Sequence, residues 1–197
     1  MALRWVVFSC AGLVSSISSV AAAQSLTTNT VVHGTLSAPG QVQTYTFSAD
    51  LDQSVYLSCV ESSTGSPLAP RITVLNPTLT LVAREGGDER AFVPLGISSI
   101  GTYSVRIDSP GSGTGAYDLS FVQQPGPSEL GALVNDGVRH ETLDRGDLDT
   151  FSFSASAGET VELSVVSALS SAMRPAGFLS GPGFAGQLWR ATASSPA

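Results

Sequence analysis

The sequence predicts an all-β fold, an antiparallel β-sandwich or jelly roll that is duplicated and whose second copy is incomplete. About eight short segments alternate apolar and polar residues with a period of two, the pattern of strands buried on one face. The 20 glycines and 11 prolines, together with many serines and threonines, supply turns between short strands. Outside the first residues, no stretch of ten or more residues has the 3.6-residue apolar period of a helix. Strands without helices predict a sandwich or a jelly roll.

One block of sequence occurs twice, and this repeat predicts the duplication. Its matching stretches are Val31–Leu36, Gly40–Ala49 and Ser54–Ser58 in the first copy, and Val138–Leu143, Gly146–Ala155 and Thr160–Ser164 in the second. A repeat spaced this far along the chain indicates a duplicated domain rather than a solenoid unit.

Residues 1–23 have the pattern of a secretory signal peptide. Arg4 provides a positive start, Trp5–Val14 is a short apolar run, and Ala21–Ala23 offers small residues for cleavage before Gln24. The apolar run is too short to span a bilayer, and no other segment comes closer. We therefore expect a secreted protein, extracellular or periplasmic, with no membrane span.

Residues 24–123 are predicted to form the first β-sandwich domain, with a frayed start at Gln24–Thr30. Its expected strands are Val31–Leu36, Thr44–Ser48, Ser54–Val60, Arg71–Leu75, Leu79–Arg84, Phe92–Leu95, Thr102–Ile107 and Ala116–Val122. The apolar positions of these strands predict a core that contains Tyr45, Phe47, Val55, Leu57, Tyr103, Val105, Tyr117 and Leu119.

Two residues of the strand Ser54–Val60 need an interpretation of their own. Cys59, in phase with Val55 and Leu57, is predicted to be a small buried hydrophobe rather than a reactive thiol. Tyr56 is out of phase and is expected on the opposite, solvent-facing side of the strand.

Residues 124–130 are predicted to be a linker, because two prolines and a glycine within this stretch cannot join a sheet ladder. Residues 131–197 would form the truncated second domain, with strands at Thr150–Ser154 and Thr160–Ser164. Counterparts of the last three strands of the first domain are missing. We therefore expect Met173–Ala197 to be loosely held, with Leu188 and Trp189 exposed or covered by a partner.

The charge balance excludes some classes of partner. The chain carries nine arginines, no lysine and sixteen acidic residues, for a net charge of −7. Nucleic acid requires a surface of clustered positive charge, and anionic membranes attract such surfaces too. The sequence therefore predicts that neither is a partner.

Several motifs resemble the bacterial pre-peptidase C-terminal domain family. They are the opening Gly146–Phe153, which reads Gly-Asp-Leu-Asp-Thr-Phe-Ser-Phe, and the closing stretches Gly101–Ile107 and Gly115–Phe121. The resemblance covers residues 31–122 once and residues 138–190 as a partial second copy. It implies a jelly-roll sandwich appended to secreted hydrolases, often peptidases. Some relatives bind collagen-like or polysaccharide matrices, and some bind calcium. We expect no peptidase domain ahead of these modules in this chain.

Asp147 and Asp149 are the candidate metal ligands. They lie two residues apart on a predicted strand or its approach, so their carboxylates would point to one side and would suit Ca²⁺. Asp136, Glu141 and Asp144 are near enough in sequence to add ligands. The alternative is a solvated acidic edge, because Gln41 and Gln43 stand at the same places in the first copy. Glu85, Asp88 and Glu89 form a weaker candidate that reads more simply as an exposed hairpin turn.

No catalytic residues are predicted. His33 and His140 occupy equivalent places in the two copies, as expected of a scaffold position duplicated with its domain. A nucleophilic serine needs a strained turn beside a base, and the chain has no Gly-x-Ser-x-Gly stretch. We expect a protein that is not an enzyme.

Two functions remain open from the sequence. The favoured one is a secreted, non-catalytic β-sandwich module that binds extracellular matrix, polysaccharide or a protein partner. The alternative is a fragment of a secreted hydrolase or peptidase whose catalytic domain lies outside this chain. Continuation of the reading frame beyond Ala197 would favour the fragment.

Overall fold

A computed structural model of the chain describes residues 23–63, 65–166, 176–181 and 184–190. These residues form strands, turns and irregular segments but no helix. No helix that could cross a membrane is found in this part of the chain. The predicted signal peptide lies outside the described residues, except for Ala23.

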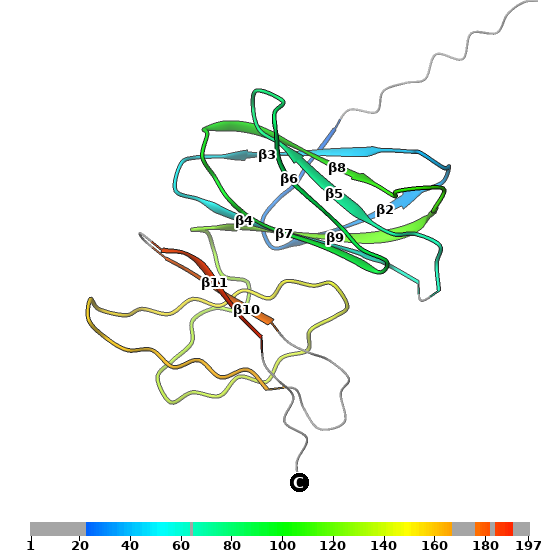
Figure 1. Cartoon of the computed structure of the whole chain (residues 1–197). Helices are drawn as coiled ribbons and strands as arrows, with labels where there is room; N and C mark the ends of the chain where they lie inside the picture. The colour runs from blue at the N-terminus through cyan, green and yellow to red at the C-terminus, as the bar shows by residue number, and fades with distance from the viewer. Residues whose placement is uncertain (1–22, 64, 167–175, 182–183, 191–197) are drawn as a thin grey trace, which may run out of the picture.

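Nine strands form two sheets that pack face to face (Figure 1). The five-stranded sheet has the order β1 (Gln24–Ser25), β3 (Gln43–Ala49), β8 (Gly101–Asp108), β5 (Arg71–Leu75) and β6 (Leu81–Gly86). The four-stranded sheet has the order β2 (Thr30–Leu36), β9 (Gly115–Gln124), β4 (Ser54–Glu61) and β7 (Arg90–Gly96). All neighbours are antiparallel except β1 and β3. The predicted all-β antiparallel sandwich is confirmed.

All eight strands expected in residues 24–123 are present, with ends shifted by up to two residues. Both ends of β6 are shifted by two residues, and it begins at Leu81 because Asn76 organises a turn before it. The Oδ1 atom of Asn76 accepts hydrogen bonds from the backbone amides of Thr78 (3.0 Å) and Thr80 (2.9 Å). A side chain that accepts hydrogen bonds from nearby backbone amides stabilises a turn, and these amides then do not pair with a neighbouring strand.

The expected fraying of Gln24–Thr30 is wrong. Residues Gln24 and Ser25 pair in parallel with Tyr45 and Thr46 of β3. The amide of Leu26 donates to the carbonyl of Thr46 (2.7 Å), and the Leu26 side chain is buried in the core. The apolar Leu26 anchors this segment, because its burial offsets the entropy of ordering a chain end.

The core lies between the two sheets, and all eight residues predicted for it are buried. Phe47 stacks on Tyr103 (ring centroids 5.1 Å apart) and contacts Phe121 across the sandwich (5.2 Å). The hydroxyl groups of Tyr45 and Tyr117 are hydrogen-bonded at 2.7 Å, so these buried polar atoms are satisfied. Cys59 is a free, fully buried cysteine, as predicted, and burial raises the pKa of its thiol well above the ordinary value.

The strands predicted at Thr150–Ser154 and Thr160–Ser164 are wrong. Residues 125–166 form only one isolated bridge, between Ala132 and Ser152. In the sandwich, the equivalent strands β3 and β4 pair with β8, β7 and β9, whereas in the described part of the chain no strand pairs with residues 150–154 or 160–164. A strand without a partner leaves its backbone groups unpaired. Val161 and Val165, which match the buried Val55 and Cys59 of the first copy, are 44% and 43% exposed.

Beyond this irregular segment, β10 (Ala176–Gly181) and β11 (Phe184–Arg190) form an antiparallel hairpin. It lies beside β4 and β7, on the outer side of the four-stranded sheet (Figure 1). Phe178 contacts the rings of Tyr56 (5.2 Å) and Phe92 (4.8 Å) on that face. The prediction of a solvent-facing Tyr56 is therefore wrong: it faces away from the core but is only 8% exposed.

The predictions for Met173–Ala197 are only partly covered by the structure. The ends of this stretch and the side chains of Leu188 and Trp189 lie outside the described residues. The division of the chain into two domains and a linker stays a prediction.

Candidate functional site

Asp147 and Asp149 lie in a loop rather than on a strand, and this loop approaches β4 at Gly146. The loop begins with a turn in which the amide of Asp147 donates to the carbonyl of Asp144 (3.2 Å). Gly146 has a φ of 83°, and a Cβ atom there would lie 2.4 Å from Val60. Only glycine combines this backbone conformation with such a close approach. Gly146 thus lets the loop approach the four-stranded sheet, where the neighbouring Asp147 lines a cavity.

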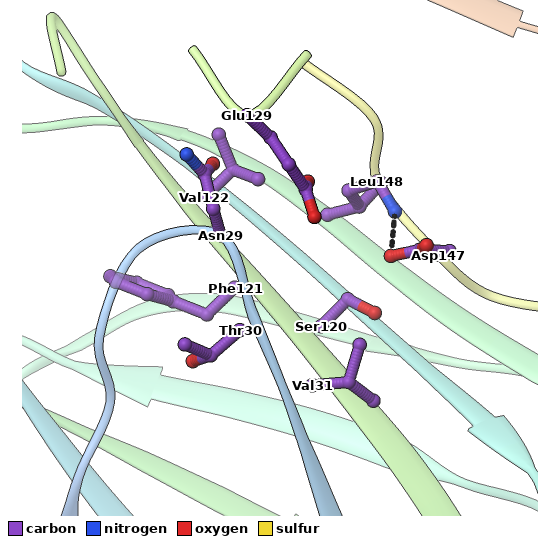
Figure 2. A pocket seen from close by; sticks show the side chains of 9 residues that line it. All are labelled: Asn29, Thr30, Val31, Ser120, Phe121, Val122, Glu129, Asp147 and Leu148. Atoms are coloured by element: carbon purple, nitrogen blue, oxygen red, sulfur yellow. Dashed lines mark hydrogen bonds between the residues drawn. The ribbon is translucent and has the colours of Figure 1, made fainter. Parts of the chain in front are cut away.

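A cavity of about 160 Å³ lies between this loop and the sheet (Figure 2). It is lined by Asn29, Thr30, Val31, Ser120, Phe121, Val122, Glu129, Asp147 and Leu148. On its wall, the Oδ1 atom of Asp147 accepts a hydrogen bond from the amide of Leu148 (2.8 Å).

Asn29 joins the sandwich to this loop region from the other side of the cavity. Its Nδ2 atom donates to the carbonyl of Pro127 (2.8 Å), and its Oδ1 atom accepts from the hydroxyl of Thr150 (3.2 Å). Neither Asn29 nor Glu129 was a sequence candidate. Nothing in the sequence marks them, because contacts across about a hundred residues have no local pattern.

Neighbouring acidic side chains raise the pKa values of Asp149 and Glu129. Partial burial raises the pKa of Asp149 to about 6, and the charges of Asp147, Glu129, Glu141 and Asp144 add to the effect. Burial and Asp147 also raise the pKa of Glu129. Like charges disfavour ionisation of a neighbouring carboxyl group. The structure therefore brings together Asp147, Asp149, Glu141 and Asp144 of the predicted cluster and adds Glu129.

We expect Asp149 to bind a proton near pH 6, and Asp147→Asn to lower that midpoint. Because the folded-state pKa lies above the unfolded value, this carboxyl destabilises the folded form above pH 6, and the penalty disappears as the pH falls toward 4. A carbon-13 NMR titration of the Asp149 carboxyl group measures the midpoint directly. Asp136→Asn, a change at a residue that does not contribute to the shift, is the control. An unchanged midpoint in Asp147→Asn would contradict the cluster.

The calcium site at Asp147 and Asp149 stays a prediction. In the described ranges, no group of three or more His, Cys, Asp or Glu side chains is arranged to hold a metal ion. The weaker candidate at Glu85, Asp88 and Glu89 lies at the β6–β7 turn. There the Glu89 carboxylate accepts from Arg145 (3.3 Å). Arg145 also donates to the buried Glu61 (3.3 Å), so it links the loop region to the sandwich.

If calcium binds at this acidic loop, adding it should raise the melting temperature of the protein, because binding stabilises only the folded form. The double variant Asp147→Asn, Asp149→Asn should lose the increase. Differential scanning fluorimetry with calcium, with magnesium and with a chelator measures it. Equal melting temperatures of the unaltered protein in all three conditions would remove this site.

A second candidate site is an open groove of about 330 Å³ on the outer face of the five-stranded sheet. Its lining residues are Val42, Thr44, Thr73, Arg84, Arg106 and Asp108. The strand register sets four of them in one row across β3, β8, β5 and β6: Thr44 opposes Arg106, Arg106 opposes Thr73, and Thr73 opposes Arg84. Directly opposed residues point to the same face of a sheet.

The groove differs in charge from the rest of the protein. Asp108 is paired with Arg71 through two hydrogen bonds, from Nε (2.7 Å) and Nη2 (2.8 Å). Among the described residues, no carboxylate lies within 4.0 Å of Arg84 or Arg106. Sequence reasoning missed both arginines. The alternation of apolar and polar residues places Arg84 and Arg106 on outward faces of their strands. Only the pairing register of β6, β5 and β8 brings the two side chains into one row.

His33 lies opposite Asp118 on the outer face of the four-stranded sheet, with 2.6 Å between Nδ1 and Oδ1. His33 is exposed, and no serine hydroxyl is hydrogen-bonded to its ring in the described part of the chain. The pair therefore lacks the nucleophile of a serine hydrolase. His140 is exposed as well.

No protein-family model matches the chain, and no curated protein matches it. Among solved structures, the pre-peptidase C-terminal domain of collagenase from Bacillus anthracis is similar, at 16% identity and a TM-score of 0.43. That match covers 50% of this chain and 93% of the domain. PliG from Aeromonas hydrophila, a periplasmic inhibitor of g-type lysozyme, matches at 14% identity and a TM-score of 0.36. This match covers 50% of the present chain and 95% of PliG. Both TM-scores are below 0.5, so neither match carries an argument about ligand or activity. Membership in the pre-peptidase C-terminal domain family stays a prediction.

Proposed function

We propose that the protein is a secreted, non-catalytic module that binds an extracellular polymer through the outer face of its five-stranded sheet. One observation carries the proposal: the two sheets of the sandwich differ in what lies on their outer faces. Tyr56, Ser58 and Ser120 of the four-stranded sheet are buried beneath the rest of the chain. The five-stranded sheet instead presents an open groove with the exposed side chains of Thr44, Arg84 and Arg106.

A sheet face of this kind is suited to binding. The backbone groups of β8 and β5 are paired on both sides, so these strands hold their outward side chains in a fixed arrangement. The core behind the groove is closed by fully buried side chains such as Tyr103, Val105 and Ile72. A ligand would meet a preformed surface and would order little of the protein on binding.

The proposed location outside the cell rests on the pattern of residues 1–23. Matrix, polysaccharide and protein ligands all remain within this proposal. The expected absence of catalysis also belongs to it. An assay of the purified protein on each polymer that it binds, with product release as the readout, tests this part. Release that depends on the protein would contradict a purely binding role.

Thr44→Trp tests the binding face, because an indole at this exposed position would fill the groove. We expect the variant to lose retention on polymers that hold the unaltered protein, in pull-down assays with insoluble polysaccharides and collagen. Thr35→Trp is the matched control: Thr35 is an exposed residue on β2, at the edge of the other sheet. Equal retention of the two variants would contradict binding through the groove.

A further inference from the structure

The two arginines of the groove are close enough to act on one ligand. They stand on β8 and β6 with only β5 between them, and neighbouring strands lie about 4.8 Å apart. Their backbones are therefore about 10 Å apart, which is within the combined reach of two arginine side chains. The Nε atom of Arg84 donates to the Thr73 hydroxyl (3.3 Å), which holds its guanidinium over β5, on the side toward Arg106.

The positive charge of the groove favours an anionic ligand. Arg71, Arg84 and Arg106 are concentrated on this face with one acidic residue, Asp108, whose two carboxylate oxygens both accept from Arg71. Arg84 and Arg106 keep their guanidinium groups unpaired by acids, in a chain whose net charge is −7. Two like charges facing one groove are unfavourable until an anion lies between them. Guanidinium groups bind carboxylates through paired hydrogen bonds of matching geometry.

The other lining residues indicate what carries the anion. Thr44 provides an exposed hydroxyl group, whereas the hydroxyl group of Thr73 is buried and accepts from Arg84. None of the six lining residues is aromatic. A groove without an aromatic platform lacks the usual stacking surface for a neutral sugar. The central strands beneath the groove, β8 and β5, are paired on both sides, so an extended peptide lying over them would gain no ladder hydrogen bonds. A polymer with its own hydroxyl groups and repeated carboxylates matches the hydroxyl group of Thr44 and the guanidinium groups of Arg84 and Arg106.

We propose that this groove binds carboxylated polysaccharides, with Arg84 and Arg106 clamping one uronate carboxylate and Thr44 meeting the sugar hydroxyls. This inference rests on the proposed function and narrows it to one chemical class of polymer. It also requires that binding weakens with added salt, because exposed charge interactions are screened.

The test is isothermal titration calorimetry of the full mature chain with oligogalacturonate, with neutral dextran oligomers as the control ligand. We expect binding of oligogalacturonate only. Arg84→Ala and Arg106→Ala should each weaken it about tenfold or more, since each removes charge-assisted hydrogen bonds. Arg84→Lys and Arg106→Lys should bind more tightly than the alanine variants but less tightly than the unaltered protein. Lysine keeps the positive charge but lacks the paired hydrogen-bond donors of a guanidinium group. Arg139→Ala, which removes the same charge beside Glu141, should bind as the unaltered protein does.

Asp108→Asn provides a test of opposite sign. It removes the one carboxylate that would repel the ligand and releases Arg71 from its ion pair. We expect tighter binding of oligogalacturonate, by several-fold, in a variant whose thermal melt shows that it is folded. Unchanged or weaker binding by the folded variant would contradict the electrostatic basis of the groove.

Further ligands separate the possible sources of the anion. Binding of dextran sulfate alone would assign the groove to sulfate groups and overturn the carboxylate assignment. Equal binding of polyglutamate and oligogalacturonate would overturn the choice of a polysaccharide. The protein could also be retained on collagen or a neutral polysaccharide. If Thr44→Trp abolished that retention and the arginine variants left it intact, this inference would be overturned and the proposed function supported. Retention on no polymer at all would contradict the proposed function itself.

Discussion

Replacing Phe47 with alanine is expected to lower the free energy of unfolding by about 3–5 kcal/mol. Phe47 is 1% exposed, and its ring contacts Tyr103 of its own sheet and Phe121 of the opposite sheet. Its removal opens a cavity between the two layers, where surrounding strands held by two-sided pairing relax only partly. Urea denaturation of the protein, followed by intrinsic fluorescence, measures the loss.

Ser48→Ala is the control for Phe47→Ala. Ser48 is the next residue on β3 and points outward, so its replacement should change the free energy of unfolding by less than about 0.5 kcal/mol. A cost below about 1 kcal/mol for Phe47→Ala would mean that this ring is not part of a close-packed core.

Replacing Gly34 with alanine is expected to destabilise the sandwich by about 1–3 kcal/mol. A Cβ atom at Gly34 would lie 2.3 Å from Cζ of Tyr117, the residue directly opposite on β9. Tyr117 has little freedom to move, since its hydroxyl is hydrogen-bonded to Tyr45 (2.7 Å) and donates to Gln43 (3.1 Å). Where a strand glycine has free space around it, the same change stabilises the protein by about 0.5–1 kcal/mol. The sign of the effect therefore shows whether the Tyr117 ring lies against Gly34.

Gly96→Ala is the matched control, because Gly96 lies on β7 and no atom is within 4 Å of the Cβ that it would gain. We expect its melting temperature to equal or exceed that of the unaltered protein. In the double variant Gly34→Ala, Tyr117→Leu, the shorter side chain should remove the clash, so the two changes should cost less together than their sum. A Gly34→Ala variant that melts no lower than Gly96→Ala would contradict this packing.

The first sandwich could be predicted because its strands repeat a local pattern. In Thr44–Ser48 the aromatic side chains alternate with hydroxyl residues, and β8 and β9 alternate in the same way. A period of two is the signature of a strand with one buried face, and this pattern does not depend on which strand is the partner. The same reasoning placed Cys59 correctly in the core.

The same pattern failed in the second copy, where alternation is present but partners are missing. Thr150–Ser154 repeats the alternation of β3, yet no strand forms, because a period of two does not supply the neighbouring backbone that a ladder requires. The position of Gly34 in the first copy is Glu141 in the second, which would not fit beneath a ring like Tyr117. Tyr56 was misjudged for a related reason, since Phe178, far along the chain, covers it.

By itself, the sequence determined the fold class, the strands of the first sandwich, its core and the choice of Asp147 and Asp149 as acidic candidates. Each of these depends on neighbours within a few residues. The tertiary structure alone decided that Asp149 shares its surroundings with Glu129, and that Arg84 and Arg106 stand in one row. The row depends on the pairing of β5 with both β6 and β8. That pairing is set by the packing of the whole sandwich, because a shift of one residue in either register would separate the two arginines onto opposite faces.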